Sequence, residues 1–153
     1  MLAVGDSAPS FELEAGTGER VATERLRGAR WVIYFYPKDN TPGCTIETCE
    51  FGQASSEFAQ RGIRVFGCSV GDAAAKKAFA ESCDASELPL LADPDHEVAQ
   101  AFGVWVQRSY AGRDYMGIAR TTFVIGPDGK IEQVFEGVKP AGHAEEVLAA
   151  LPA

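Results

Sequence analysis

The sequence predicts an α/β sandwich in which helices flank a central mixed sheet. Strand-like and helix-like segments alternate early in the chain, which favours helices packed against a sheet. An unbroken apolar run over residues 31–36 is typical of a central strand covered on both faces. Strand patterns on both sides of residues 126–129, which read Gly-Pro-Asp-Gly, predict a terminal hairpin.

An additional hairpin is expected at the N-terminus. Apolar and acidic residues alternate over residues 11–14, the glycine-rich turn 16–18 follows, and Val21 resumes the extended pattern. Thr23 is expected to cap a short helix that ends at Gly28.

The remaining elements follow from capping residues and apolar patterning. They are a helix from Pro42 to Gly62, a strand over 63–70, a helix over 73–84 capped by Asp72, a strand over 88–91, a helix from Asp93 and Pro94 to Phe102, hairpin strands over 121–125 and 131–135, and a helix over 143–151. No repeat or linker interrupts this order, so we expect residues 1–153 to form one domain.

Composition and charge exclude several classes of function. The net charge of −8 argues against nucleic acid or an anionic membrane as a partner, because both need basic surfaces. Residues 1–9 show no leader pattern, and no apolar run approaches the roughly 18 residues of a membrane span. We therefore expect a cytoplasmic, reducing location, where the four cysteines are catalytic or idle rather than a disulfide framework.

One cysteine lies where a helix is expected to begin, directly after the central strand. Pro42 and Gly43 open that helix, so Cys44 falls in its first turn, and Cys49 follows five residues later. A helix N-terminus offers free N–H groups and partial positive charge, and both favour a thiolate. The pattern predicts a redox active site.

This segment resembles the peroxiredoxins, and most closely their PrxQ or bacterioferritin comigratory protein branch. The family signature Pro-x-x-x-Thr-x-x-Cys is met by Pro37, Thr41 and Cys44, and the branch-specific form of residues 36–45 is intact. The likeness continues over nearly the whole chain, including the stretches 102–105 and 117–123. It implies a thioredoxin-like sandwich with the N-terminal hairpin as an extension.

The resemblance implies a thiol peroxidase that reduces hydrogen peroxide and alkyl hydroperoxides without metal, haem or flavin. Cys44 would be the peroxidatic cysteine, and its own N–H and the Thr41 hydroxyl would donate to the reacting groups. Pro37 would shield the pocket from water, and Arg120 would stabilise the thiolate and the developing oxyanion. Thioredoxin or a similar dithiol protein would be the reductant, and the enzyme is expected to be a monomer.

The product on Cys44 would be a sulfenic acid that condenses with a second thiol, for which Cys49 is the first candidate. In an intact helix, two Cα atoms five residues apart are roughly 8 to 9 Å apart, whereas a disulfide tolerates about 7 Å. Resolution therefore requires the helix start to unwind. Gly52 and Gln53 replace an Arg-Asp pair usual in the family, so we expect this stretch to be weakly held.

Two further cysteines have separate interpretations. Cys83 lies near the end of the predicted helix 73–84, and some members of the branch carry their resolving cysteine on the corresponding helix. It is the alternative resolver. Cys68 lies within a predicted interior strand and is expected to be an inert, buried residue.

Other chemistries have little support. His96 and His143 are expected on the solvated surface, and no paired Cys-x-x-Cys supplies a metal-ligand set or the motif of a thiol-disulfide oxidoreductase. The acidic residues 93–97 favour a helix start over a cation site. Trp105 and Tyr110 lie near an expected loop, where aromatic residues usually serve packing, and we assign them no role. A redox sensor or a chaperone-like binding protein remains the alternative from another functional class.

Overall fold

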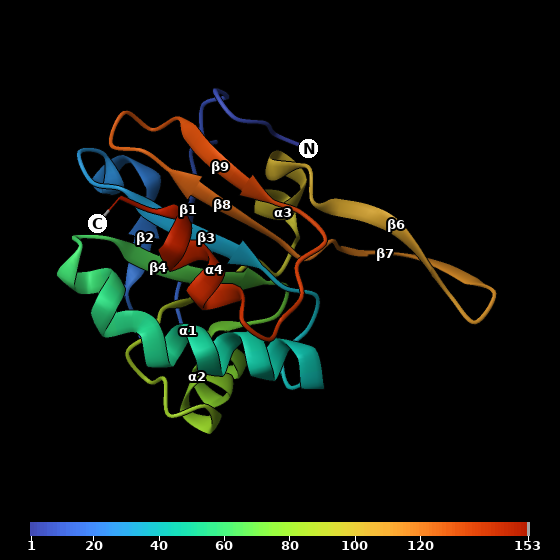
Figure 1. Cartoon of the computed structure of the whole chain (residues 1–153). Coiled ribbons are helices and arrows are strands. Elements are labelled where there is room, and N and C mark those ends of the chain that lie inside the picture. The colour runs from blue at the N-terminus through green and yellow to red at the C-terminus, as the bar shows by residue number, and fades with distance from the viewer. Residues whose placement is uncertain (153) are drawn as a thin grey trace.

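A five-stranded sheet with helices on both faces forms the centre of the computed structural model, which describes residues 1–152 (Figure 1). The strands are β1 (Glu12–Glu14), β2 (Arg20–Ala22), β3 (Trp31–Phe35), β4 (Arg64–Ser69), β5 (Leu90–Ala92), β6 (Trp105–Tyr110), β7 (Arg113–Ile118), β8 (Thr121–Ile125) and β9 (Ile131–Phe135). The helices are the 3₁₀ helix η1 (Thr23–Leu26), α1 (Pro42–Gln60), α2 (Ala73–Ser82), α3 (Glu97–Phe102) and α4 (His143–Ala150).

The central sheet is mixed, as the sequence predicts. Its strand order is β5-β4-β3-β8-β9, with parallel pairing among β3, β4 and β5 and antiparallel pairing of β8 with β3 and β9. Every residue of β3 is buried, because helices or loops cover the sheet on both sides. The long connection α1 joins the parallel strands β3 and β4, so this helix begins at the carboxyl end of the central strand.

Alternation along β3 divides its side chains between two hydrophobic clusters. Val32 and Tyr34 pack in the cluster beneath α1, α2 and α4, where Tyr34 stacks on Phe51 of α1 at 4.4 Å between ring centroids. Ile33 and Phe35 pack on the opposite side with α3 and the N-terminal hairpin. The first face therefore carries α1, the helix whose first turn contains Cys44.

Several predicted boundaries are confirmed. The N-terminal hairpin pairs Leu13 with Val21, and α1 ends just before Gly62, whose φ of 72° suits a glycine after a helix. The Asp72 carboxylate caps α2 by accepting the N–H of Ala75 at 2.8 Å.

Two predicted helix starts are wrong. Thr23 does not cap a helix, because its hydroxyl donates to the Phe11 carbonyl and accepts the Phe11 N–H, which ties η1 to the preceding strand segment. The helix expected from Asp93 begins instead at Glu97. The buried Asp93 carboxylate accepts the N–H groups of Val98 and Ala99, so the acidic cluster does mark a helix start, four residues early.

The hairpin β6–β7 is absent from the sequence-based prediction. It projects from the body of the protein, and its tip turns through Ala111 and Gly112, whose φ values are 52° and 79° (Figure 1). Most of its side chains are exposed on both faces, so the usual apolar alternation of a strand is missing. At its base, Trp105 stacks on His96 with ring centroids 4.1 Å apart.

The expectation of a solvated His143 is also wrong. This side chain is buried, and its two ring nitrogens lie 2.7 Å from the Thr122 hydroxyl and from Glu146. Burial lowers its pKa despite the neighbouring Glu146.

No helix within residues 1–152 is both long and apolar enough to cross a membrane.

Candidate active site

Cys44 lies in the first turn of α1 and is completely buried. Thr41 precedes the helix in an extended conformation, and Pro42 supplies the fixed φ that suits a first helical position. The Thr45 N–H donates to the Thr41 carbonyl at 2.8 Å and closes the first turn. The sulfur is therefore held at a helix N-terminus, where partial positive charge gathers.

Arg120, between β7 and β8, brings a permanent positive charge to the sulfur. Its Nη2 donates to Cys44 Sγ at 3.4 Å, and its Nη1 donates to Glu47 Oε1 at 2.7 Å. Gly43 leaves room for this approach, because a Cβ at that position would lie 3.2 Å from Nη2. Two residues expected in the site, Cys44 and Arg120, are thus brought into direct contact.

Glu47 is a site residue that the sequence analysis missed. It is buried, its Oε2 has no hydrogen-bond partner among the described residues, and desolvation raises its pKa to about 7 although the Arg120 charge opposes this rise. The available signal was its position three residues after Cys44, which places both side chains on one helix face.

The guanidinium of Arg120 remains a cation in this environment. Burial alone would lower its pKa, but the negative charges of Glu47 and Cys44 and their hydrogen bonds outweigh burial and raise it. Glu47 is therefore the member of the ion pair whose charge changes near neutral pH.

Thr41 and Pro37 belong to the loop between β3 and α1. The Thr41 hydroxyl donates to the Lys38 carbonyl at 2.9 Å, and the structure of residues 1–152 records no hydrogen bond from it to the Cys44 sulfur. The hydroxyl oxygen can still accept a hydrogen bond. Pro37 is half-buried and directly follows the buried Tyr36.

Asp39 anchors this loop to the body of the protein. Its carboxylate accepts hydrogen bonds from the buried Lys76 ammonium of α2 at 2.9 and 3.0 Å, and from the Tyr36 hydroxyl at 2.7 Å. Lys76 also donates to Ser69 and to the Val70 carbonyl. The loop that carries Thr41 is thereby fixed to α2 and to the end of β4.

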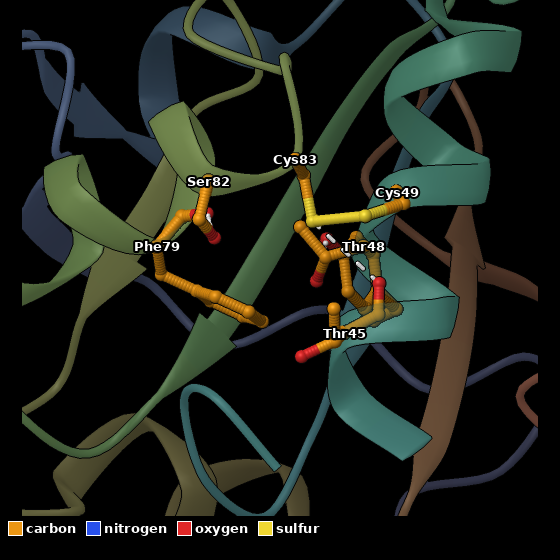
Figure 2. Close-up of a disulfide and its surroundings, with 7 residues drawn as sticks. Thr45, Thr48, Cys49, Phe79, Ser82 and Cys83 are labelled. Carbon is orange, nitrogen blue, oxygen red and sulfur yellow. Dashed lines mark hydrogen bonds between the residues drawn. A yellow bond between two sulfur atoms is a disulfide. The ribbon is translucent and has the colours of Figure 1, made fainter. Parts of the chain in front are cut away.

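The two candidate resolving cysteines are bonded to each other. A disulfide joins Cys49 of α1 to Cys83 at the end of α2, with Cα atoms 4.9 Å apart (Figure 2). Cys44 and Cys68 are free and buried. Burial raises the pKa of the Cys68 thiol well above its ordinary value, which is consistent with an inert residue.

Gly52 has a packing role that the sequence analysis did not anticipate. A Cβ at this position would lie 2.6 Å from the Ala85 Cβ, so glycine is required for α1 to approach the segment that follows α2. This close approach is next to the Cys49–Cys83 bond.

The described residues offer no cluster of metal ligands. Among the described residues, no group of three or more His, Cys, Asp or Glu side chains could hold a metal ion. The chemistry that this arrangement offers is that of a buried sulfur beside a fixed cation.

Comparison with known proteins places this arrangement in a family. The model of the AhpC/TSA family matches residues 4–134. The chain is 41% identical to Peroxiredoxin Bcp of Escherichia coli K12 over 147 residues, which cover 96% of this chain and 94% of that protein. It is 40% identical to a putative peroxiredoxin Bcp of Coxiella burnetii over 152 residues, or 98% and 99% of the two chains.

Solved structures agree. The bacterioferritin comigratory protein of Xanthomonas campestris, studied for alkyl peroxide reduction, superposes with a TM-score of 0.85 at 35% identity, covering 92% of this chain and 88% of that one. Peroxidoxin BcpB of Mycobacterium tuberculosis superposes with a TM-score of 0.85 at 34% identity over 100% of both chains. These neighbours confirm the thioredoxin-like peroxiredoxin fold, and the chain belongs to the AhpC/TSA family, within the Bcp/PrxQ peroxiredoxins, which are thiol peroxidases.

Proposed function

We propose that Cys44 is the peroxidatic cysteine of this chain and that it reduces hydrogen peroxide and alkyl hydroperoxides. One observation carries the proposal: the only sulfur in the first turn of α1 is buried against the Arg120 guanidinium, at 3.4 Å. A permanent cation and a helix N-terminus both stabilise a thiolate, the form of cysteine that attacks peroxides.

In the first step, the Cys44 thiolate attacks one peroxide oxygen and the O–O bond breaks. The other oxygen leaves with the bonding electrons as hydroxide or alkoxide and takes a proton to become water or an alcohol. Arg120 stabilises this negative charge, and the Cys44 N–H donates to the reacting oxygens. Thr41 completes the site when its hydroxyl turns from the Lys38 carbonyl toward the peroxide. Pro37 limits the entry of water.

In the second step, the Cys44 sulfenic acid condenses with the Cys49 thiol to give a disulfide and water. The first turns of α1 must unwind for this step, because an intact helix holds the two Cα atoms roughly 8 to 9 Å apart. A dithiol protein of the thioredoxin type then supplies the two electrons that return the cysteines to thiols.

The setting of the reaction belongs to the same proposal. The protein acts in the cytoplasm, where a thioredoxin-type reductant is available, and it acts as a monomer. Its net charge of −8 disfavours nucleic acid and anionic membrane surfaces as partners.

Steady-state peroxide consumption with thioredoxin and thioredoxin reductase tests the proposal. Cys44→Ser is expected to abolish turnover without changing the fold, because a serine hydroxyl is a poor nucleophile of nearly the same size. Cys68→Ala is the matched control, and it should retain turnover, because Cys68 is buried away from the site in the opposite cluster. Turnover by Cys44→Ser would contradict the assignment, and a single oxidation without repeated turnover would indicate a sensor.

A further inference from the structure

The Cys49–Cys83 disulfide is unexpected for a simple pair of peroxidatic and resolving cysteines. It uses both thiols that could resolve the Cys44 sulfenic acid, yet Cys44 itself is free beside Arg120. Helix α1 is continuous from Pro42 to Gln60 in this state. The Cys49–Cys83 disulfide is therefore compatible with a fully formed peroxide site.

We propose that Cys83 releases Cys44 from its disulfide with Cys49, so that the bond reduced by the external dithiol is Cys49–Cys83. This inference rests on the proposed function, since it begins from the Cys44–Cys49 disulfide formed there. The three cysteines then act in sequence as peroxidatic, resolving and releasing thiols.

The added step is a thiol-disulfide exchange that is balanced without any further oxidant. The Cys83 thiol gives its proton to solvent, and its thiolate attacks the Cys49 sulfur of the Cys44–Cys49 bond. The Cys49–Cys83 bond forms, the Cys44–Cys49 bond breaks, and Cys44 leaves as a thiolate. The number of disulfides is unchanged, so the two electrons accepted by the peroxide are still recovered from the external dithiol.

Helix geometry gives the exchange its direction. Cys49 lies five residues after Cys44, about 140° farther around the helix, so their sulfurs leave α1 on different faces. The Cys49 and Cys83 Cα atoms are 4.9 Å apart with the helix intact, within the ordinary range of a disulfide. Exchange therefore allows the unwound turns of α1 to reform and returns the Cys44 thiolate to Arg120.

The segment around Cys83 is already positioned against α1. Its Sγ lies 3.6 Å from the Thr45 carbonyl oxygen, one residue from Cys44 in the chain (Figure 2). Gly52 lets Ala85 approach the next turns of the same helix. Cys83 is thus held where its thiolate can reach the Cys49 sulfur while the first turns of α1 are unwound.

A consequence distinguishes this scheme from a two-cysteine cycle. After one equivalent of peroxide, Cys44 is a free thiolate again and the oxidised protein can react with a second equivalent. With both other thiols bonded together, the resulting sulfenic acid has no internal partner and persists. In a two-cysteine cycle, Cys44 is locked in a disulfide and does not react.

The test treats fully reduced Cys68→Ala protein with one equivalent of peroxide and maps disulfides by mass spectrometry over time. We expect Cys44–Cys49 to appear first and to convert to Cys49–Cys83, after which a second equivalent gives a sulfenic acid on Cys44 that dimedone traps. In Cys83→Ser, Cys44–Cys49 should persist, the second equivalent should not react, and amides 41–49 should exchange hydrogen faster than in the oxidised Cys68→Ala protein.

Three results would overturn the proposal. These are a final disulfide that contains Cys44, a transient Cys44–Cys83 bond, or formation of Cys49–Cys83 in Cys44→Ser as fast as in the parent protein. The first two results still show peroxide reacting at Cys44 and leave the proposed peroxidase intact. Failure of the peroxidase itself would appear as no sulfenic acid and no disulfide containing Cys44 at any time.

Discussion

At the scale of single residues, the site depends on how three charges share a small buried volume. Arg120 donates to both the Cys44 sulfur and Glu47, so the charge state of Glu47 decides how much of the guanidinium charge is left for the sulfur. The Glu47 carboxyl titrates in the physiological range, because its pKa is raised by burial to about 7.

Glu47 should make stability depend on pH. Its folded-state pKa of about 7 exceeds the value of about 4.3 in an unfolded chain, so its stabilising effect is present at low pH and is lost as the pH rises through 7. Glu47→Gln removes this loss, so the stability of the variant relative to wild type should rise by up to about 3 kcal/mol between about pH 5 and pH 8. Urea denaturation of the reduced proteins at each pH measures this difference in the free energy of unfolding.

Glu57→Gln is the control for this measurement, since Glu57 lies on the same helix but is exposed. Its stability relative to wild type should not vary with pH. A constant difference between Glu47→Gln and wild type across the same range would show that Glu47 ionises normally.

At the scale of elements, the loop before α1 and the helix α2 are joined by a buried ion pair. Lys76 is fully buried and makes four hydrogen bonds, two of them to Asp39 of the loop. The same helix α2 carries Cys83 at its C-terminal end. The loop of the proposed peroxide site and the proposed releasing thiol are thus both held by α2.

Lys76→Met should loosen this support. The substitution leaves the nearly buried Asp39 carboxylate without its cation, and removal of one partner from a buried pair typically costs about 3 kcal/mol or more. We expect a lower urea midpoint and faster amide exchange over residues 37–41. Lys77→Met, at the exposed neighbouring position, should change neither property. Equal midpoints for the two variants would assign the Lys76 contacts no net effect.

At the scale of the whole molecule, the Cys49–Cys83 bond joins two elements that are 34 residues apart in the chain. Such a link restricts the unfolded chain and stabilises the folded state. The oxidised and reduced proteins therefore differ in stability as well as in chemistry.

The oxidised protein should be about 4 kcal/mol more stable than the reduced one, from the loop-closure entropy of a 34-residue separation. Urea unfolding with and without a dithiol reductant measures the difference. A variant with both Cys49→Ser and Cys83→Ser should show equal midpoints in the two conditions. If the wild type also showed equal midpoints, the disulfide would not constrain the unfolded chain.

Elements with strong local signals could be predicted from the sequence. The apolar run of β3, the Pro-Gly start of α1 and the turn between β8 and β9 determine their structures locally, and all three agree with the structure. The hairpin β6–β7 could not be predicted in this way, because most of its side chains are exposed on both faces and its apolar residues do not alternate with polar ones.

The same distinction applies within the site. The contact of Cys44 with Arg120 was expected from the family resemblance, whereas the burial of Glu47 and His143 results from tertiary packing. Both residues are polar and look solvent-exposed when the chain is examined one helix at a time. The pairing of Cys49 with Cys83 likewise depends on how α1 and α2 pack.

The contact between Gly52 and Ala85 has an evolutionary consequence. Any side chain at position 52 would push the segment after α2 outward, because its Cβ would lie 2.6 Å from that of Ala85. Position 83 would move with this segment and lose its reach to Cys49. Gly52 and Cys83 should therefore be inherited together, so that a lineage losing the glycine is free to lose the third cysteine as well.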